Sequence, residues 1–212
     1  MSHFPAHPGR RLACAALLVL PLATGCATNR VSFHETNPEY AGKPMKSLMV
    51  YAITYDKVLR RVYEDRMVAR LADRGIKGVP SYASIEKNGE EEKVVVRTAI
   101  EKAGVDGILL SRAGAIDRST TRVSGGTLAV GTGSGWGGFY GYYNNVWHVT
   151  EYAPTDIRGS AWMNSTSSLF DARSGEQVWT GSVETSMEKD IGPTVNKYVD
   201  LVFRTMVADK VI

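Results

Sequence analysis

The sequence predicts an α/β sandwich with a mixed sheet, in which a parallel amino-terminal half is followed by antiparallel hairpins and a carboxy-terminal helix. Three observations support this fold class. Between residues 47 and 110, short apolar runs alternate with helical patterns, which is typical of β-α-β-α-β units with right-handed crossovers. Two strand-like segments flank a turn between residues 160 and 186. A last apolar stripe at helical spacing follows.

The parallel half begins with the apolar run 47–53, which predicts a buried strand. Asp56 can cap the start of a helix. We expect this helix to end at Gly75, with the glycine in a left-handed conformation. The buried stripe of this helix repeats every four residues: Leu59, Tyr63, Met67 and Leu71. Its other side is charged and predicts a solvated face: Arg60, Arg61, Glu64, Asp65, Arg66 and Arg70.

A second strand is expected over 76–81, where Pro80 restricts it to an edge or an end of the sheet. The helical spacing of Val96, Ala99, Ile100 and Ala103 predicts a second helix, and a third strand follows at 106–110.

The antiparallel half is clearest in a hairpin formed by Ser160–Phe170 and Glu176–Ser186, in which Trp179 and Val183 share one face. The last helix begins near Pro193, a residue that suits a first helical turn. Five residues form its predicted buried stripe: Val195, Tyr198, Val199, Val202 and Met206.

The amino terminus has the three parts of an export signal in order. Arg10 and Arg11 precede a short apolar segment that ends in Leu22-Ala23-Thr24-Gly25-Cys26, and the latter resembles a bacterial lipobox. Residues 1–25 are therefore expected to be removed as a lipoprotein signal peptide, with a lipid, palmitate among its chains, on Cys26. Two or more acyl chains make such anchoring stable. Because Ala27 follows the cysteine instead of Asp, the resemblance implies the outer membrane, without indicating which face.

Composition limits the classes of partner and cofactor. Residues 1–25 contain two of the 25 Lys and Arg and none of the 22 Asp and Glu, so the mature charge is 23 minus 22, or +1. This gives no basic surface for nucleic acid. Cys14 leaves with the signal, and only His34 and His148 remain of the four histidines. No disulfide, metal site or cofactor is expected.

The sequence predicts three regions: the signal peptide 1–25, a lipid-anchored tether 26–46, and one α/β domain 47–212. The domain contains a Gly- and aromatic-rich segment, 124–145, with eight glycines. One interpretation is a mobile loop between strands. The other is a loop whose aromatic rings contact a partner. The candidate contact residues are Trp136, Phe139, Tyr140, Tyr142 and Tyr143.

Several short motifs lack the context that their chemistry needs. The run 133–138 matches G-x-G-x-x-G, but the aromatic residues after it are β-prone, so the helix that the motif needs is not expected. Ser84 and Lys87 match S-x-x-K without its companion motifs. His148 has no nucleophile and carboxylate at a diagnostic spacing, so no catalytic residue is assigned. Arg112, Arg118, Arg122 and Arg158 could read an anion, but pairing on the sheet surface is the preferred interpretation.

Four stretches resemble a family of bacterial lipoproteins of unknown function over about residues 26–212. They are Arg60–Asp65 (RRVYED), Pro80–Tyr82, Gly104–Leu109 (GVDGIL) and Leu169–Gly181 (LFDARSGEQVWTG). The strand and helix order is more distantly similar to the α/β domains of the Tol-system periplasmic protein, the curli secretion pore lipoprotein and lipoprotein activators of cell-wall synthases. The resemblance implies a location in the envelope and no catalytic residues.

Together these observations predict a non-catalytic lipoprotein of the cell envelope that binds or scaffolds another envelope protein or a glycan. One alternative is a subunit of an outer-membrane secretion pore, in which hairpins around 111–123 and 146–158 would form a barrel in an oligomer; the oligomeric state is left open. This alternative requires outward apolar alternation, which Ser119–Arg122 does not supply. An envelope hydrolase is the second alternative and requires a nucleophile, a base and an oxyanion site that converge.

Overall fold

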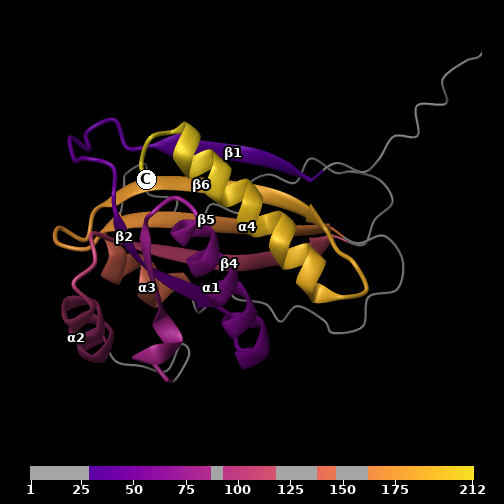
Figure 1. Ribbon diagram of the computed structural model, residues 1–212, viewed down its shortest axis with the longest axis horizontal. Helices are drawn as coiled ribbons and strands as arrows, with labels where there is room; N and C mark the ends of the chain where they lie inside the picture. Colours follow the sequence, from indigo (N-terminus) through magenta and orange to yellow (C-terminus); the bar gives the residue numbers. More distant parts are fainter. Residues whose placement is uncertain (1–28, 87–92, 118–137, 147–161) are drawn as a thin grey trace, which may run out of the picture.

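The computed structural model describes residues 29–86, 93–117, 138–146 and 162–212, and all structural statements concern these residues. They form one mixed six-stranded sheet in the order β1-β6-β5-β4-β2-β3, with helices on both faces (Figure 1). The prediction of an α/β fold with a mixed sheet and a carboxy-terminal helix is confirmed.

The parallel half is centred on β2 (Ser47–Ile53), which pairs in parallel with β3 (Lys77–Pro80) on one side and β4 (Gly107–Asp117) on the other. The helix α1 (Lys57–Ala72) connects β2 to β3. A short 3₁₀ helix, η1 (Ser81–Ala83), and then α2 (Lys93–Ala103) follow β3. β3 lies at the sheet edge, as its proline predicts.

The ends of α1 follow from local chemistry. Asp56 is its N-cap, and the Oδ1 atom of Asp56 accepts hydrogen bonds from the backbone N–H groups of Val58 and Leu59 at 2.8 and 3.0 Å. These bonds satisfy two donors that have no partner inside the helix. After the helix, Gly75 adopts the left-handed conformation with φ +74°, which costs glycine little.

The antiparallel half consists of β5 (Trp162–Asp171), which pairs with β4 and with β6 (Gln177–Ser186). The strand β1 (Arg30–Thr36) pairs with the far side of β6 and forms the other sheet edge. The chain ends in α4 (Ile191–Ala208). The predicted hairpin and last helix are therefore present, and all five predicted residues of the α4 stripe are buried.

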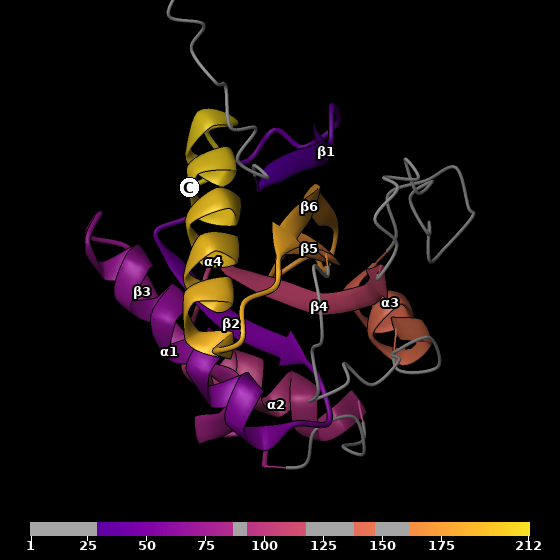
Figure 2. The ribbon, with the colours of Figure 1, turned by 90° about the vertical axis from the view of Figure 1, so that its right-hand side faces the viewer.

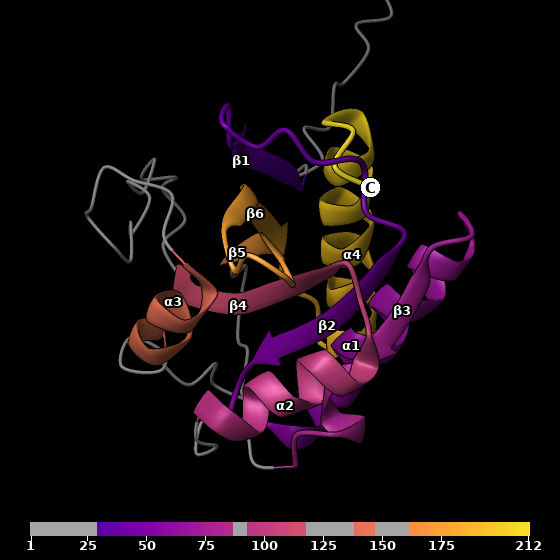
Figure 3. The same cartoon turned by 90° about the vertical axis from the view of Figure 1, so that its left-hand side faces the viewer.

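Two apolar cores lie on opposite faces of the sheet. α1 and α4 cover one face, where Trp179 and Val183 pack with Leu48 and Leu109. α2 and α3 (Phe139–Val146) pack on the other face against Ile108 and Phe170. Figures 2 and 3 show α4 on one side of β5 and β6 and α3 on the other side of the sheet. Both faces of β2 are buried as a result, which explains why its sequence is continuously apolar.

The structure corrects two boundaries of the sequence interpretation. Residues 30–36 of the expected tether 26–46 form β1, because Val31 can pack on the α1–α4 core while the backbone completes the edge of β6. Met45 is also buried in that core. Residues 139–145 of the expected loop 124–145 belong to α3, because their aromatic rings supply an apolar side to a helix that covers the sheet.

Candidate functional site

The carboxyl ends of the parallel strands are the place where an α/β sheet usually presents a site. β2 and β4 are neighbouring parallel strands, and the helices that connect to them lie on opposite faces of the sheet. The helix α1, which follows β2, covers one face, whereas α2, which precedes β4, covers the other. The end of β2 lies beside Arg112 of β4, which pairs with Ile53. The end of β3 leads into Ser81 and Tyr82.

A buried ion pair occupies this edge. Arg60 Nε donates to Glu64 Oε1 at 3.0 Å, and the two side chains are 3% and 0% exposed. Oε1 also accepts from the backbone N–H of Ala52 at 3.0 Å and from Ser81 Oγ at 2.8 Å, while Oε2 accepts from the N–H of Tyr82 at 3.0 Å. The carboxylate thus ties α1 to the end of β2 and to η1.

The guanidinium of Arg60 is held as firmly as the carboxylate. Its NH2 group donates to Ser81 Oγ at 2.7 Å, and its Cζ lies 5.1 Å from the centre of the Tyr51 ring. This position corrects the expectation that the whole charged side of the helix is solvated. The signal in the sequence was the i, i+4 spacing of Arg60 and Glu64, which also fits an exposed pair. Only the packing of η1 over α1 distinguishes the two cases.

An outer layer lies over the ion pair. The Cζ of Arg61 is 4.6 Å from the centre of the Tyr82 ring, and the Tyr82 hydroxyl donates to Asp65 Oδ1 at 2.5 Å. The hydrogen bond to Asp65 raises the pKa of Tyr82, because it stabilises the protonated phenol. These contacts fix η1 to the first turns of α1 from the solvent side.

A chain of four hydroxyl groups crosses the core beside this cluster. Tyr63 and Ser111 are 2.5 Å apart, Ser111 and Ser167 are 2.7 Å apart, and Ser167 and Tyr198 are 2.6 Å apart. Burial raises the pKa of Tyr198 to about 12 and raises that of Tyr63 well above its usual value. Both phenols therefore stay neutral near pH 7 and are poor proton acceptors. The chain links α1, β4, β5 and α4.

The only described histidine, His34 in β1, lies at the opposite edge of the sheet. Its Nδ1 lies 2.8 Å from Asp209 Oδ2, and the same oxygen accepts from Trp179 Nε1 at 2.7 Å. No described hydroxyl group is hydrogen-bonded to His34. Ser32 Oγ instead donates to the carbonyl of Ser182 at 3.1 Å. Within the described residues, this Asp–His pair therefore has no serine nucleophile in hydrogen-bond contact.

The predicted contact aromatics are largely part of the core. Phe139 and Tyr143 are 1% and 2% exposed, and the centre of the Phe139 ring lies 5.4 Å from that of Phe170. The Tyr143 hydroxyl is 3.2 Å from that of Tyr51. Tyr140 and Tyr142 are half-buried, the former with Arg97 Cζ 4.8 Å from its ring centre. These rings hold α3 to the sheet, and in this conformation Phe139 and Tyr143 have almost no surface to offer a partner.

The remaining predicted residues lie outside the described part of the chain. These are Cys26, Trp136, His148, Arg118, Arg122 and Arg158. Arg112 is described and lies buried in β4, not on the sheet surface. Among the residues that are described, no group of three His, Cys, Asp or Glu side chains is arranged to hold a metal ion. None of the described helices is long and apolar enough to cross a bilayer.

On the face of the antiparallel half away from α4, the described helix α3 packs on the Phe170 end of β5. On the side of β1, β6 and β5 away from α4, Thr166 and Ser182 hydroxyls are 3.2 Å apart and Arg30 makes two hydrogen bonds to Glu184. Phe33 stands 41% exposed on the edge strand. These hydroxyl and charged groups are paired with one another within the sheet.

Comparison with known proteins gives only low similarities. No protein-family model and no curated protein matches the chain. Among solved structures, the PelC dodecamer from Paraburkholderia phytofirmans shares 11% identity with a TM-score of 0.43, covering 84% of this chain and 95% of that one. Lipoprotein GNA1162 from Neisseria meningitidis shares 14% identity with a TM-score of 0.39, covering 76% and 98%. At this level the similarities carry no functional argument.

Proposed function

We propose that the chain is a lipid-anchored lipoprotein of the bacterial outer membrane with a non-catalytic binding or scaffolding role. The observation that carries this proposal is the order of basic residues, short apolar segment and small residues that ends at Cys26. A diacylated cysteine would hold the domain at the bilayer without a spanning helix. The partner would be another envelope protein or a glycan.

The chemistry of the described polar groups supports a non-catalytic role. A general base needs a free lone pair and a pKa near the working pH. The Glu64 carboxylate is buried and accepts four hydrogen bonds from its own fold. The serines of the core are bonded to each other and to phenols whose pKa values are raised. These groups stabilise the fold, and the Ser81 hydroxyl, which donates to the Glu64 carboxylate, is itself fully buried.

The experiment tests whether Cys26 carries a lipid. Cells that express the chain are labelled with a palmitate analogue and fractionated, alongside a Cys26→Ser variant and a Cys14→Ser control. We expect label and outer-membrane sedimentation for the parent and the control, and loss of both for Cys26→Ser. A membrane-bound, unlabelled parent protein would contradict lipid anchoring.

The binding role needs a separate measurement. Crosslinking in living cells, followed by purification of the lipidated chain, should give a discrete adduct with one envelope component. The adduct should diminish when Cys26→Ser releases the domain from the membrane. Substrate turnover by the purified chain, with no adduct in cells, would contradict the non-catalytic role.

A further inference from the structure

The first described residue is fixed to the sheet. Asn29 Oδ1 accepts hydrogen bonds from the backbone N–H of Ser186 at 2.7 Å and from Ser186 Oγ at 3.0 Å. The next residue, Arg30, forms a bidentate pair with Glu184 at 2.8 and 3.0 Å. The described part of the fold therefore starts at Asn29, at the place where β6 ends.

This start leaves very little chain between the fold and Cys26. Only Ala27 and Thr28 intervene, so three Cα–Cα steps separate Cys26 from Asn29. In any conformation these steps span at most about 11 Å. The tether 26–46 expected from composition would have reached roughly 70 Å by the same measure. The pairing of β1 thus changes a long connection into a very short one.

The same end of the sheet contains several other elements. Ser186 pairs with Trp162 at the start of β5, and Trp162 pairs with Asp117 at the end of β4. The exposed Lys189 and the helix cap Asp190 follow directly after β6. Figure 2 looks onto this end of the molecule. Trp162 is half-buried there, and tryptophan is a residue that favours membrane–water interfaces.

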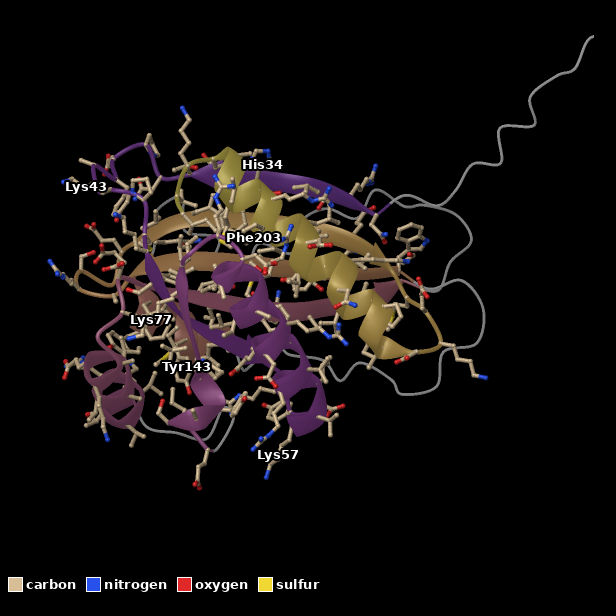
Figure 4. The ribbon with its side chains drawn as sticks, viewed as in Figure 1. His34, Lys43, Lys57, Lys77, Tyr143 and Phe203 are labelled. Atoms are coloured by element: carbon tan, nitrogen blue, oxygen red, sulfur yellow. The ribbon has the colours of Figure 1, made fainter. Side chains whose placement is uncertain are left out.

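The opposite end lies far from this point. The turn around Arg173 and Gly175 precedes β6, whose ten residues span about 34 Å. Lys43 projects at this far end, in the connection from β1 to β2 (Figure 4). A probe there and a probe at Lys189 would therefore report on different distances from a surface that lies across the end of the sheet at Asn29.

We propose that the end of the sheet formed by Asn29, Trp162, Ser186 and Lys189 lies against the headgroups of the bilayer that anchors the chain. This inference rests on the proposed lipidation of Cys26. Because the connection is short, Asn29 stays within about 11 Å of the anchoring residue, and in the proposed orientation the turn at Arg173 points away from the membrane. The strands then stand upright on the bilayer.

The test uses the lipidated full chain added to preformed phosphatidylcholine vesicles that carry a spin label on the lipid headgroup. Cys26 and Cys14 are the two cysteines of the sequence, and Cys14 leaves with the signal. A fluorophore can therefore be placed on a single introduced cysteine, in Lys189→Cys or in Lys43→Cys. We expect several-fold stronger quenching at position 189 than at position 43. Equal quenching at both positions would overturn the proposal.

A second variant tests the short connection itself. Sixteen Gly and Ser residues inserted between Thr28 and Asn29 should reduce the quenching at position 189 toward that at position 43, while the protein still floats with the vesicles. An undiminished difference would overturn the role of the short connection. If the protein without the insertion does not float with the vesicles, lipid anchoring itself is contradicted. Failure of the proposed orientation can therefore be distinguished from failure of the proposed lipid anchor.

Discussion

Arg60 and Glu64 form an ion pair inside the protein, with 3.0 Å between Nε and Oε1 and almost no exposed surface on either side chain. Burying two charges is costly, and the cost is offset here because backbone N–H groups and Ser81 complete the hydrogen bonds of the carboxylate. The pair lies where the first helix, the central strand and the 3₁₀ helix meet. Its removal should therefore affect the whole domain.

The first prediction concerns this pair. Glu64→Gln leaves the buried Arg60 charge without its counterion, and we expect a loss of about 3–5 kcal/mol in the free energy of unfolding, measured with urea. The control is Asp200→Asn, which removes the partly exposed Arg70–Asp200 pair and should cost at most about 1 kcal/mol. Similar losses for both variants would contradict a structural role for the buried pair.

The second prediction concerns alkaline pH. The pKa of Tyr198 is about 12 in the folded chain, against 10.0 ordinarily, because the phenol is buried. Below pH 10 both states keep the proton, so its stabilising contribution is fully present. Between pH 10 and 12 the unfolded chain releases the proton first, and stability should fall by about 1.4 kcal/mol per pH unit for this group.

The measurement is urea unfolding at several pH values between 8 and 11. Tyr198→Phe should lower stability at neutral pH, because Ser167 loses a hydrogen-bond partner. Its free energy of unfolding should then decline less steeply above pH 10 than that of the parent. Equal slopes for the two proteins would show that this phenol ionises alike in both states.

The third prediction separates core packing from partner contact in α3. Phe139→Ala removes a ring that is 1% exposed and should destabilise the domain by about 3–5 kcal/mol. Tyr140→Ala removes a half-buried ring beside Arg97 and should cost about 1–2 kcal/mol. Thermal and urea unfolding measure both. A stable Phe139→Ala variant that loses its adduct in cells would favour the contact-loop interpretation.

The fourth prediction compares two glycines with open space around the missing Cβ. Gly175 has φ +74°, whereas Gly141 lies inside α3. Gly175→Ala should destabilise by about 1–2 kcal/mol, because a side chain strains the left-handed conformation. Gly141→Ala should stabilise by about 0.5–1 kcal/mol through helix propensity. Changes of the same sign in the two unfolding curves would contradict this difference.

The comparison with the sequence shows which signals were strong. The mainly apolar runs 47–53 and 106–110, the helical stripes of α1 and α4 and the hairpin each give a clear pattern, and all of these elements are present. β1 was missed because Arg30–Thr36 mixes polar residues with only Val31 and Phe33, and its partner lies some 150 residues away. The α3 helix was missed because glycines among aromatics resemble a loop until the sheet supplies a surface for the rings.

The candidate site shows the same limit. Arg60 and Glu64 have the spacing of an exposed pair, and nothing near them in the sequence indicates that Ser81 and Tyr82 cover them. Asp56 and Gly75 were predictable because a cap and a left-handed turn depend on local chemistry. Burial of a charge depends on a distant element, and only the assembled fold reveals it.

The pairing of β1 with β6 also determines when folding can finish. Val31 lies opposite Val183, so the sheet cannot gain this edge until almost the whole polypeptide has been delivered. If the chain is exported amino terminus first, β1 stays unpaired until the residues of β6 have also crossed the membrane. Maturation of the native domain should therefore follow the completion of secretion, and a nascent chain halted before residue 177 should remain sensitive to protease.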